Sequence, residues 1–264
     1  MPDVAPAARL DGFTVLVARP AQQADALCAL IEAHGGRVIR LPMIEIAPVA
    51  DPAAAAATLA AARKHDRWLF TSTNAVRHAA DLLAPPWPAC AAVGQATAAA
   101  LQAQGGRDVL VPEAGDGAQA LLQHPALQRI DGQRHLIVTG EQTLPDLEAG
   151  LRARGAQVAV LAVYRRIPVA HDPATVVAAL EQADLAVIPS GEALRQLLAL
   201  TPSAARARLR ALQLAVPSPR VVETARDAGF IGTPLLPHRV SDSAYLDLIL
   251  QFSGANARQR PRTV

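Results

Sequence analysis

The chain is poor in aromatic residues and has no long apolar run. Aromatic side chains make up 3% of the 264 residues, although 51% of the residues are hydrophobic. The core must therefore be built from Ala, Val, Leu and Ile, which suits helices packed on a parallel sheet. No apolar run reaches the ~20 residues that a membrane helix needs. The chain also opens without a signal-peptide pattern, so we expect a cytoplasmic protein with no membrane partner.

Cysteine and net charge are also scarce. The two cysteines, Cys28 and Cys90, lack metal-ligand spacing and indicate core packing in a reducing compartment. The formal net charge of +2 is too small to predict nucleic-acid binding. The basic segment 256–264 is predicted to be a disordered tail. We expect a monomer without a nucleic-acid partner.

The familiar catalytic motifs are missing as well. There is no Gly-x-x-x-x-Gly-Lys-Ser/Thr phosphate loop, no Gly-x-Ser-x-Gly elbow and no metal spacing among the seven histidines. Gly115, Gly117 and Ala120 match a dinucleotide fingerprint, but three residues separate them from the preceding strand. The sequence therefore predicts no cofactor and no metal site. A reaction here must proceed without an evident nucleophile.

Short apolar runs alternate with helical patterns along the whole chain, which predicts an α/β fold with parallel sheets flanked by helices. Asp51-Pro52 and Asp172-Pro173 each open a helix, and Ser241 caps the last one. Strands are expected at 14–18, 38–41, 68–71, 91–93, 108–111, 136–139, 158–160, 185–188 and 214–216.

The pattern restarts after about 120 residues, which indicates an internal repeat. Pro48 to Pro52 matches Pro168 to Pro173 with one insertion, and Gly35 corresponds to Gly155. The alternative is that all α/β units share Val-rich strands and Gly stops. The common order of the matches favours duplication, and hence two similar α/β domains.

In such sheets ligands bind beyond the carboxyl ends of the strands. The loops there are small, polar and mostly at helix starts, where free N–H groups favour anions. The alternative is that Thr71, Ser72, Asn74 and Ser218 serve only as helix caps. The loops in question are Ala18–Pro20, Thr71–Asn74, Gly94–Thr97, Thr139–Glu141, Pro189–Gly191 and Pro217–Ser218.

Several of these segments together resemble the uroporphyrinogen-III synthase family: Val15–Pro20, Phe70–Val76, Ala92–Ala98 and Val163–Arg165. The resemblance implies two flavodoxin-like or Rossmann-like domains with parallel sheets, joined by a two-stranded connection at 41–48 and 161–168, with the site between them. The implied domains are residues 1–42 plus 168–255, and residues 43–167.

The resemblance also implies an activity. Family members cyclise the linear tetrapyrrole hydroxymethylbilane to uroporphyrinogen III, with loss of water and inversion of ring D, in haem biosynthesis. The substrate would be handed over by the preceding pathway enzyme. This chemistry fits the missing motifs, because the hydroxymethyl group leaves readily and the difficult part is to hold a polycarboxylate chain in one shape.

Carried over to this chain, the resemblance assigns Tyr164 as the catalytic acid or orienter. The alternative for Tyr164 is packing at an interdomain surface. At most one of Arg165 and Arg166 is expected to face the cleft, because alternate strand residues face opposite ways. The substrate-binding residues implied are Arg19, Thr71, Ser72, Asn74, Gly94, Gln95, Thr97, Gly140, Ser190 and Ser218.

The second half departs from the family pattern at Pro189–Ala193 and Val216–Arg220. Glu192 and Glu141 would disfavour an anionic substrate if they faced it. A second hypothesis is therefore a non-catalytic two-domain binding protein for a small polyanionic ligand.

Overall fold

The computed structural model describes residues 9–106, 108–141 and 145–259, and the chain divides into two compact units. Unit 1 comprises residues 1–45 and 168–264, and unit 2 comprises residues 46–167. The last helix reaches Gln259, four residues into the predicted tail. The rest of that segment, 260–264, lies outside the described residues.

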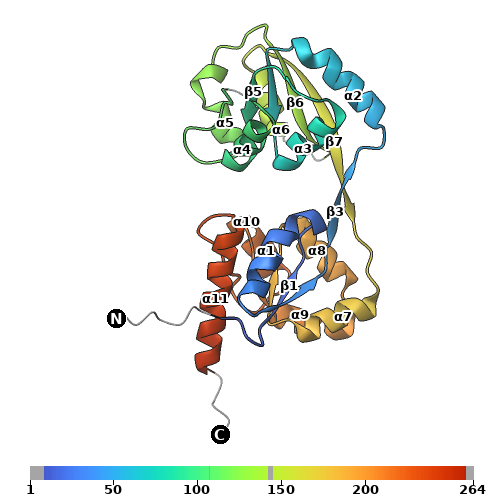
Figure 1. Cartoon of the computed structure of the whole chain (residues 1–264), viewed down its shortest axis with the longest axis vertical. Helices are drawn as coiled ribbons and strands as arrows, with labels where there is room; N and C mark the ends of the chain where they lie inside the picture. Colours follow the sequence, from blue (N-terminus) through green and yellow to red (C-terminus); the bar gives the residue numbers. More distant parts are fainter. Residues whose placement is uncertain (1–8, 107, 142–144, 260–264) are drawn as a thin grey trace, which may run out of the picture. The chain divides into compact units, whose positions relative to one another are not determined.

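Unit 1 is built on a four-stranded sheet of order β2-β1-β8-β9 (Figure 1). The β1–β2, β1–β8 and β8–β9 pairs are all parallel. Its strands are β1 (Thr14–Val17), β2 (Arg37–Arg40), β8 (Leu185–Val187) and β9 (Gln213–Ala215). Its helices are α1 (Ala21–Ala33), α7 (Pro173–Gln182), α8 (Gly191–Leu200), α9 (Arg206–Ala211), α10 (Pro219–Asp227) and α11 (Asp242–Gln259), with a 3-10 turn η3 (Ser203–Ala205).

Unit 2 is built on a five-stranded sheet of order β3-β7-β6-β4-β5. The β4–β5, β4–β6 and β6–β7 pairs are parallel. The strands of this sheet are β3 (Ile44–Pro48), β4 (Arg67–Phe70), β5 (Cys90–Ala92), β6 (Arg134–Gly140) and β7 (Gln157–Pro168). The first two residues of β3 and the last residue of β7 belong to unit 1. Its helices are α2 (Pro52–Ala61), α3 (Thr73–Leu82), α4 (Gln95–Ala103), α5 (Ala118–Leu122) and α6 (Pro145–Arg152), with 3-10 turns η1 (Ala62–Lys64) and η2 (Pro125–Leu127).

The two sheets have the same order once the repeat is applied. β2, β1, β8 and β9 of unit 1 correspond to β7, β6, β4 and β5 of unit 2. Each sheet also ends in a single parallel bridge, at Leu235 and at Leu110. These parallel sheets with helical connections confirm the predicted α/β class and support the duplication.

The helices follow the same correspondence. In unit 1, α1 and α11 pack side by side and share a core with Val15 and Val17. In unit 2, α6 and α5 pack together and share a core with Leu69 and Ile137. Both pairs appear as neighbours in Figure 1. The two repeats therefore exchange their first segments. The segment β1-α1-β2 opens the first repeat but lies in unit 1 with the end of the second repeat, and β6-α6-β7 opens the second repeat but lies in unit 2 with the end of the first.

Most predicted helix starts are present. The Asp51 side chain accepts from the Ala54 N–H at 2.9 Å, and Asp172 accepts from Ala174 at 2.7 Å. Ser241 accepts from the Ala244 N–H at 3.3 Å. Capping is decided by residues within one turn of chain, so the local sequence predicts it well.

Two sequence-based expectations need correction. Residues 108–111 were expected to form a strand, but pairing is confined to Leu110, which bridges Ala91. Asp108 has a φ of 49° and Pro112 has no N–H to donate, so a longer ladder cannot form there. The second correction concerns a boundary, because the expected strand 158–160 and the expected connecting segment 161–168 form one continuous strand, β7 (Gln157–Pro168). The expected pairing of the two connecting segments is present, since β7 lies beside β3 in the sheet.

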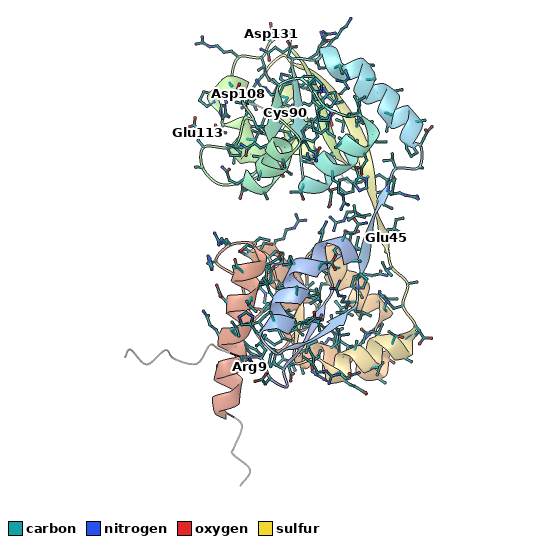
Figure 2. The ribbon with its side chains drawn as sticks, in the orientation of Figure 1. Arg9, Glu45, Cys90, Asp108, Glu113 and Asp131 are labelled. Carbon is teal, nitrogen blue, oxygen red and sulfur yellow. The ribbon has the colours of Figure 1, made fainter. Side chains whose placement is uncertain are left out.

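A pair of matching turns extends the repeat beyond the segments that the sequence matched. Gly12 and Gly132 follow Asp11 and Asp131, and their φ angles are 74° and 72°. A Cβ added at Gly35 would lie 2.3 Å from Asp11 Oδ1, and one at Gly155 would lie 2.0 Å from Asp131 Oδ1. Figure 2 labels Asp131 on its turn in unit 2. Glycine is therefore favoured at positions 35 and 155 for two reasons. The φ angles there are 84° and 83°, and an aspartate side chain occupies the space that a Cβ would need.

Among the described helices, none combines the length and apolarity needed to cross a membrane.

We expect Gly155→Ala to lower the free energy of unfolding of unit 2 more than Gly105→Ala does. The φ angles are 83° and 82°, so each variant should incur the cost of ~1–2 kcal/mol of a left-handed alanine. A Cβ at Gly105 meets nothing within 4 Å, whereas one at Gly155 also lies 3.1 Å from the Asp131 Cα. Urea unfolding of both variants measures the difference, and equal losses would contradict the role assigned to Asp131.

Candidate functional site

The loops that follow β4 and β6 meet at the carboxyl edge of the unit 2 sheet. These two strands are parallel neighbours, with Phe70 opposite Val138. Thr71 Oγ1 donates to Thr139 Oγ1 at 2.8 Å and joins the two loops. Thr71 is half-buried and Thr139 is buried. The predicted residue Thr71 thus lies at the carboxyl edge of the sheet, as expected from the sequence. Its hydroxyl proton is donated to Thr139.

Tyr164 reaches this edge because β7 is irregular. The register runs from Thr139 opposite Ala162 to Gly140 opposite Tyr164, so Val163 is an extra residue in β7. A β-bulge of this kind redirects the side chains that follow it. Val163 and Tyr164 are both buried, at 1% and 7% exposure, whereas a regular strand would turn one of them outward. The bulge therefore brings Tyr164 beside Gly140.

The ring of Tyr164 lies directly over Gly140. A Cβ added to Gly140 would be 2.6 Å from Tyr164 Cζ and 3.0 Å from its hydroxyl oxygen. Any residue other than glycine at position 140 would therefore overlap the Tyr164 ring where it now lies. Gly140 was predicted to contact substrate, and the contact that the structure shows is with Tyr164.

The hydroxyl of Tyr164 is held by Ser72. The two hydroxyl oxygens are 3.2 Å apart. Ser72 is also the N-cap of α3 and accepts from the Ala75 N–H at 3.1 Å. Capping uses an acceptor site of the Ser72 oxygen and leaves its proton available for Tyr164. Ser72 is therefore a helix cap, and the same hydroxyl also contacts Tyr164.

The starts of α3 and α4 carry the other predicted residues of unit 2. Asn74 is half-buried in the first turn of α3, and Gln95 is exposed as the first residue of α4. Thr97 is buried at 5% exposure. Neither helix has an acidic residue in its first turn. The positive field of the helix N-terminus is therefore retained at α3, whereas at α4 the carboxylate of Asp116 lies beside the N-cap.

Gly94 is the N-cap of α4, and its lack of a side chain makes room for a carboxylate. A Cβ added there would lie 2.4 Å from Asp116 Oδ1. The Gly117 N–H donates to the Val93 carbonyl at 2.6 Å and holds this loop in place. The Gly115–Gly117 segment, which looked like a dinucleotide fingerprint, therefore closes over the end of β5. The helix after it, α5, has only five residues.

In unit 1, the loop after β1 carries Arg19, whose charge is already paired. Arg19 Nη1 lies 2.5 Å from Asp242 Oδ1, and its side chain is 12% exposed. The guanidinium also lies over the ring of Tyr245, 4.7 Å from the centroid. Asp242 begins α11. Arg19 was predicted to bind a substrate carboxylate, and the structure shows it bound to a carboxylate of the chain itself.

The other two predicted residues of unit 1 differ from each other. Ser190 caps α8 and accepts from the Ala193 N–H at 3.2 Å, as Ser72 does at α3. Ser218 is the N-cap of α10, but its side chain makes no capping hydrogen bond. Glu192 lies in the first turn of α8. The start of α8 is thus less favourable to an anion than the equivalent start of α3.

Arg165 and Arg166 follow Tyr164 on β7 and are both half-buried. Arg165 Nε donates to the Pro48 carbonyl at 3.1 Å. Arg165 therefore fastens β3 to β7, which is a structural use of its charge.

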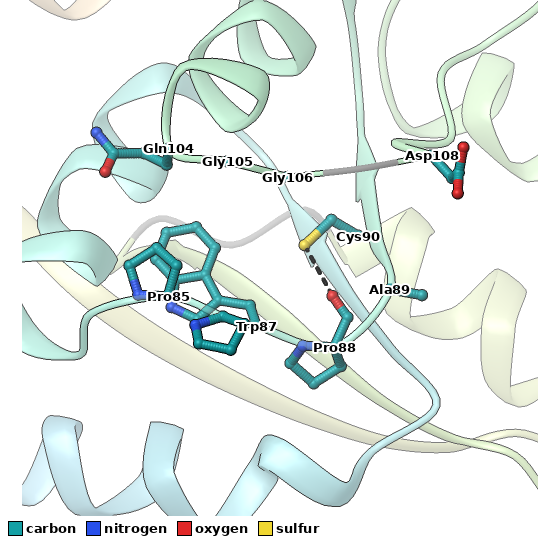
Figure 3. A pocket seen from close by; sticks show the side chains of 10 residues that line it. Pro85, Trp87, Pro88, Ala89, Cys90, Gln104, Gly105, Gly106 and Asp108 are labelled. Carbon is teal, nitrogen blue, oxygen red and sulfur yellow. Dashed lines mark hydrogen bonds between the residues drawn. The ribbon is translucent and has the colours of Figure 1, made fainter.

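A pocket of about 530 Å³ opens at the opposite edge of the unit 2 sheet (Figure 3). Cys90 begins β5, so the pocket lies at the amino end of that strand. Cys90 Sγ donates to the Pro88 carbonyl at 3.3 Å, and burial raises the pKa of this thiol to about 11. A protonated thiol is a poor nucleophile. The pocket is lined by Pro85, Pro86, Trp87, Pro88, Ala89, Cys90, Gln104, Gly105, Gly106 and Asp108.

Among residues 9–106, 108–141 and 145–259, no three His, Cys, Asp or Glu side chains gather as a metal-ligand set.

Three residues that contact predicted site residues were not identified from the sequence: Asp116, Asp242 and His78. Thr139, Asp116 and Asp242 act through contacts with residues distant in the chain. His78 stacks on the Tyr164 ring. Thr139 was identified within the predicted loop Thr139–Glu141, whereas nothing in the sequence singled out the other three.

Fold and loops define the class of this protein: a duplicated α/β protein with parallel sheets, polar strand-to-helix loops and a tyrosine hydroxyl held at one sheet edge. A family model described as "Uroporphyrinogen-III synthase HemD" matches residues 25–233. The chain belongs to the uroporphyrinogen-III synthase family, whose members are cyclising hydro-lyases of haem biosynthesis. The resemblance seen in the sequence is confirmed.

Named relatives match most of the chain. The uroporphyrinogen-III synthase of Escherichia coli K12 is 31% identical over 248 residues, which is 90% of this chain and 99% of the relative. That of Synechococcus elongatus is 33% identical over 68% of this chain and 70% of its own length. A crystal structure of a mutant uroporphyrinogen III synthase from Thermus thermophilus covers 92% of this chain and 99% of its own, with a TM-score of 0.60 and 22% identity. This structure supports the fold.

We expect Gly140→Ala to displace the Tyr164 ring, because the added methyl group overlaps it. The chain has two tyrosines, so selective isotope labelling of tyrosine gives one NMR signal set for each. The Tyr164 signals should shift and those of Tyr245, in unit 1, should not. Gly254→Ala is the control, since a Cβ there meets nothing within 4 Å. Unchanged Tyr164 signals in Gly140→Ala would contradict the close approach.

We expect Tyr245 to ionise late in an alkaline titration. Burial raises the pKa of Tyr245 to about 12 from its usual 10, against the opposing effect of Arg19. The pKa in the folded state lies above that of the unfolded chain, so this stabilising contribution is complete below about pH 10 and is lost as the pH rises toward 12. Tyrosinate absorbance measures the transition, which Tyr245→Phe should remove. A transition near the usual tyrosine pKa in the native protein, absent from Tyr245→Phe, would show that Tyr245 is not buried as described.

Proposed function

We propose that this chain cyclises hydroxymethylbilane to uroporphyrinogen III, with loss of water and inversion of ring D, and that Tyr164 is its catalytic acid. Family membership supports the reaction. The observation that carries the assignment of Tyr164 is its place at the carboxyl edge of the unit 2 sheet, over Gly140 and 3.2 Å from the Ser72 hydroxyl.

The reaction makes a modest demand on an acid. The C–O bond of the hydroxymethyl group breaks, and the departing hydroxyl needs one proton to leave as water. The phenol of Tyr164 donates that proton, and Ser72, oriented by the Ala75 N–H, donates a hydrogen bond to the phenolate that remains. The last pyrrole ring loses a proton when it regains aromaticity after ring closure, and this proton returns to Tyr164. Atoms and charges therefore balance without a further reagent.

Choosing which carbon closes the ring requires a fixed shape of the substrate. We infer that the substrate carboxylates bind at the starts of α3 and α4, where Thr71, Ser72, Asn74, Gln95 and the backbone at Gly94 lie. The absence of acidic residues from the first turn of α3 supports this for α3. At α4 the carboxylate of Asp116 lies against the N-cap, and the exposed Gln95 side chain is the proposed contact there. The buried Thr97 and Gly140 contribute by shaping this edge.

The unit 1 residues are assigned more limited roles. We propose that Ser218 contacts substrate, because its side chain makes no capping hydrogen bond. Ser190 presents the start of α8. Arg19 holds the loop after β1 against α11, and binds substrate only if the Asp242 contact opens. The proposal also includes action as a monomer in the cytoplasm and supply of substrate by the preceding pathway enzyme. Each unit is inferred to be a folding domain.

The alternative function, a non-catalytic binding protein for a polyanionic ligand, is not favoured. It rested on the altered loops of the second half. The E. coli relative matches 99% of its own length, and the tyrosine, serine and glycine of unit 2 form one connected group.

Tyr164→Phe should lower the turnover of hydroxymethylbilane severalfold without abolishing it, because the hydroxymethyl group also leaves without an acid. The assay separates the oxidised type III and type I isomers. Tyr245→Phe is the matched control, since it removes the other tyrosine hydroxyl, in unit 1. If the native protein yields only the type I isomer that forms spontaneously, the enzymatic function is wrong. If Tyr164→Phe retains full turnover, only its role as acid is wrong.

A further inference from the structure

We propose that His78 of α3 is a positioning residue that holds the Tyr164 ring over Gly140 and so keeps its hydroxyl at Ser72. The proposal rests on the catalytic role proposed for Tyr164. His78 belongs to none of the loops that the sequence singled out, and it acts through Tyr164.

The geometry is that of an offset aromatic stack. The ring centroids of His78 and Tyr164 are 5.7 Å apart, and the ring planes are inclined by 24°. Such pairs are favourable at centroid separations of roughly 4.5–7 Å. The side chains are 8% and 7% exposed, so water does not compete for this contact.

His78 completes the enclosure of the Tyr164 ring. Gly140 lies against the ring, with space for no side chain, and Ser72 meets the hydroxyl. Without the imidazole, the ring would have a void beside it and could rotate about its side-chain bonds away from Ser72. Ser72 and His78 both belong to α3 and its cap, so one helix sets the position of both the hydroxyl and the ring.

The imidazole acts as a neutral ring. Burial lowers the pKa of His78, and the nearby Arg77 lowers it further, while Asp81 has the opposite effect. Arg77 Nη2 lies 3.3 Å from His78 Nε2, and a guanidinium can only donate, so Nε2 is the acceptor. Because the imidazole is neutral and planar, the ring of a phenylalanine at position 78 can replace it in the stack on Tyr164.

Variants at His78 test the proposal in the full-length protein. His78→Ala should lower kcat by about two- to tenfold, the factor that corresponds to an aromatic pair of ordinary strength. KM should change little, because His78 lies behind Tyr164 and not at the loops. His78→Phe should restore kcat to near the native value, since it restores the stack. His65→Ala, at a half-buried histidine after η1 in the same unit, is the matched control.

A spectroscopic readout separates positioning from general loss of structure. With labelled tyrosine, His78→Ala should shift the Tyr164 signals and leave those of Tyr245 in place, and His78→Phe should keep the Tyr164 signals dispersed. Shifts of both tyrosines in His78→Ala would indicate a wider structural change, in which case His78→Phe decides. Loss of kcat in a folded His78→Phe variant would overturn the proposal.

A double variant distinguishes failure of this proposal from failure of the catalytic role of Tyr164. If His78 acts through the Tyr164 hydroxyl, His78→Ala should have no further effect on kcat in a Tyr164→Phe background. Additive losses would overturn the positioning role. Full activity of Tyr164→Phe alone would instead overturn the role of Tyr164, and the NMR signals would still show whether His78 orients the ring.

Discussion

The pairing of β7 with β6 is the contact on which the arrangement of unit 2 depends. It places Gln157–Pro168 beside the strand that ends in Gly140, and the bulge after Ala162 brings Tyr164 to the same edge as the loops of β4 and β6. Backbone hydrogen bonds fix this position, because the Glu141 N–H donates to the Tyr164 carbonyl at 3.1 Å. The side chains of Ser72 and His78 then act on a ring whose backbone is already held. A tyrosine on a loop would need other contacts for the same precision.

Duplication explains the architecture but not the chemistry. The two sheets share an order, a terminal bridge and the Asp-Gly turn that packs on a left-handed glycine. Ser72 and Ser190 cap equivalent helices with nearly the same geometry. Only Ser72 also meets a tyrosine. In unit 1, the charged residue of the first loop is used to hold α11, and Glu192 stands in the first turn of α8. The two loop sets have the same backbone plan and different side-chain contacts.

The lack of strong catalytic groups is consistent with the reaction. A substrate whose leaving group departs readily needs little acid strength, and the selectivity lies in holding one shape. Fixed hydroxyls and helix N-termini suit that purpose, because they bind carboxylates without reacting with them. Cys90, which lines the pocket described above, is protonated through its raised pKa and lies at the amino edge of the sheet, away from these loops.

The sequence by itself determined the alternation of strands and helices, the caps at Asp51, Asp172 and Ser241, and the repeat. These features depend on residues within a turn or two of each other, or on patterns that recur along the chain. It also placed Tyr164, Thr71 and Ser72 among the candidates, through the family resemblance. The tertiary structure alone decided that Tyr164 lies on Gly140, that Arg19 is paired with Asp242, and that His78 faces the tyrosine. Each of these contacts joins residues brought together by strand order, by helix packing or by one inserted residue in a strand, and no local pattern encodes them.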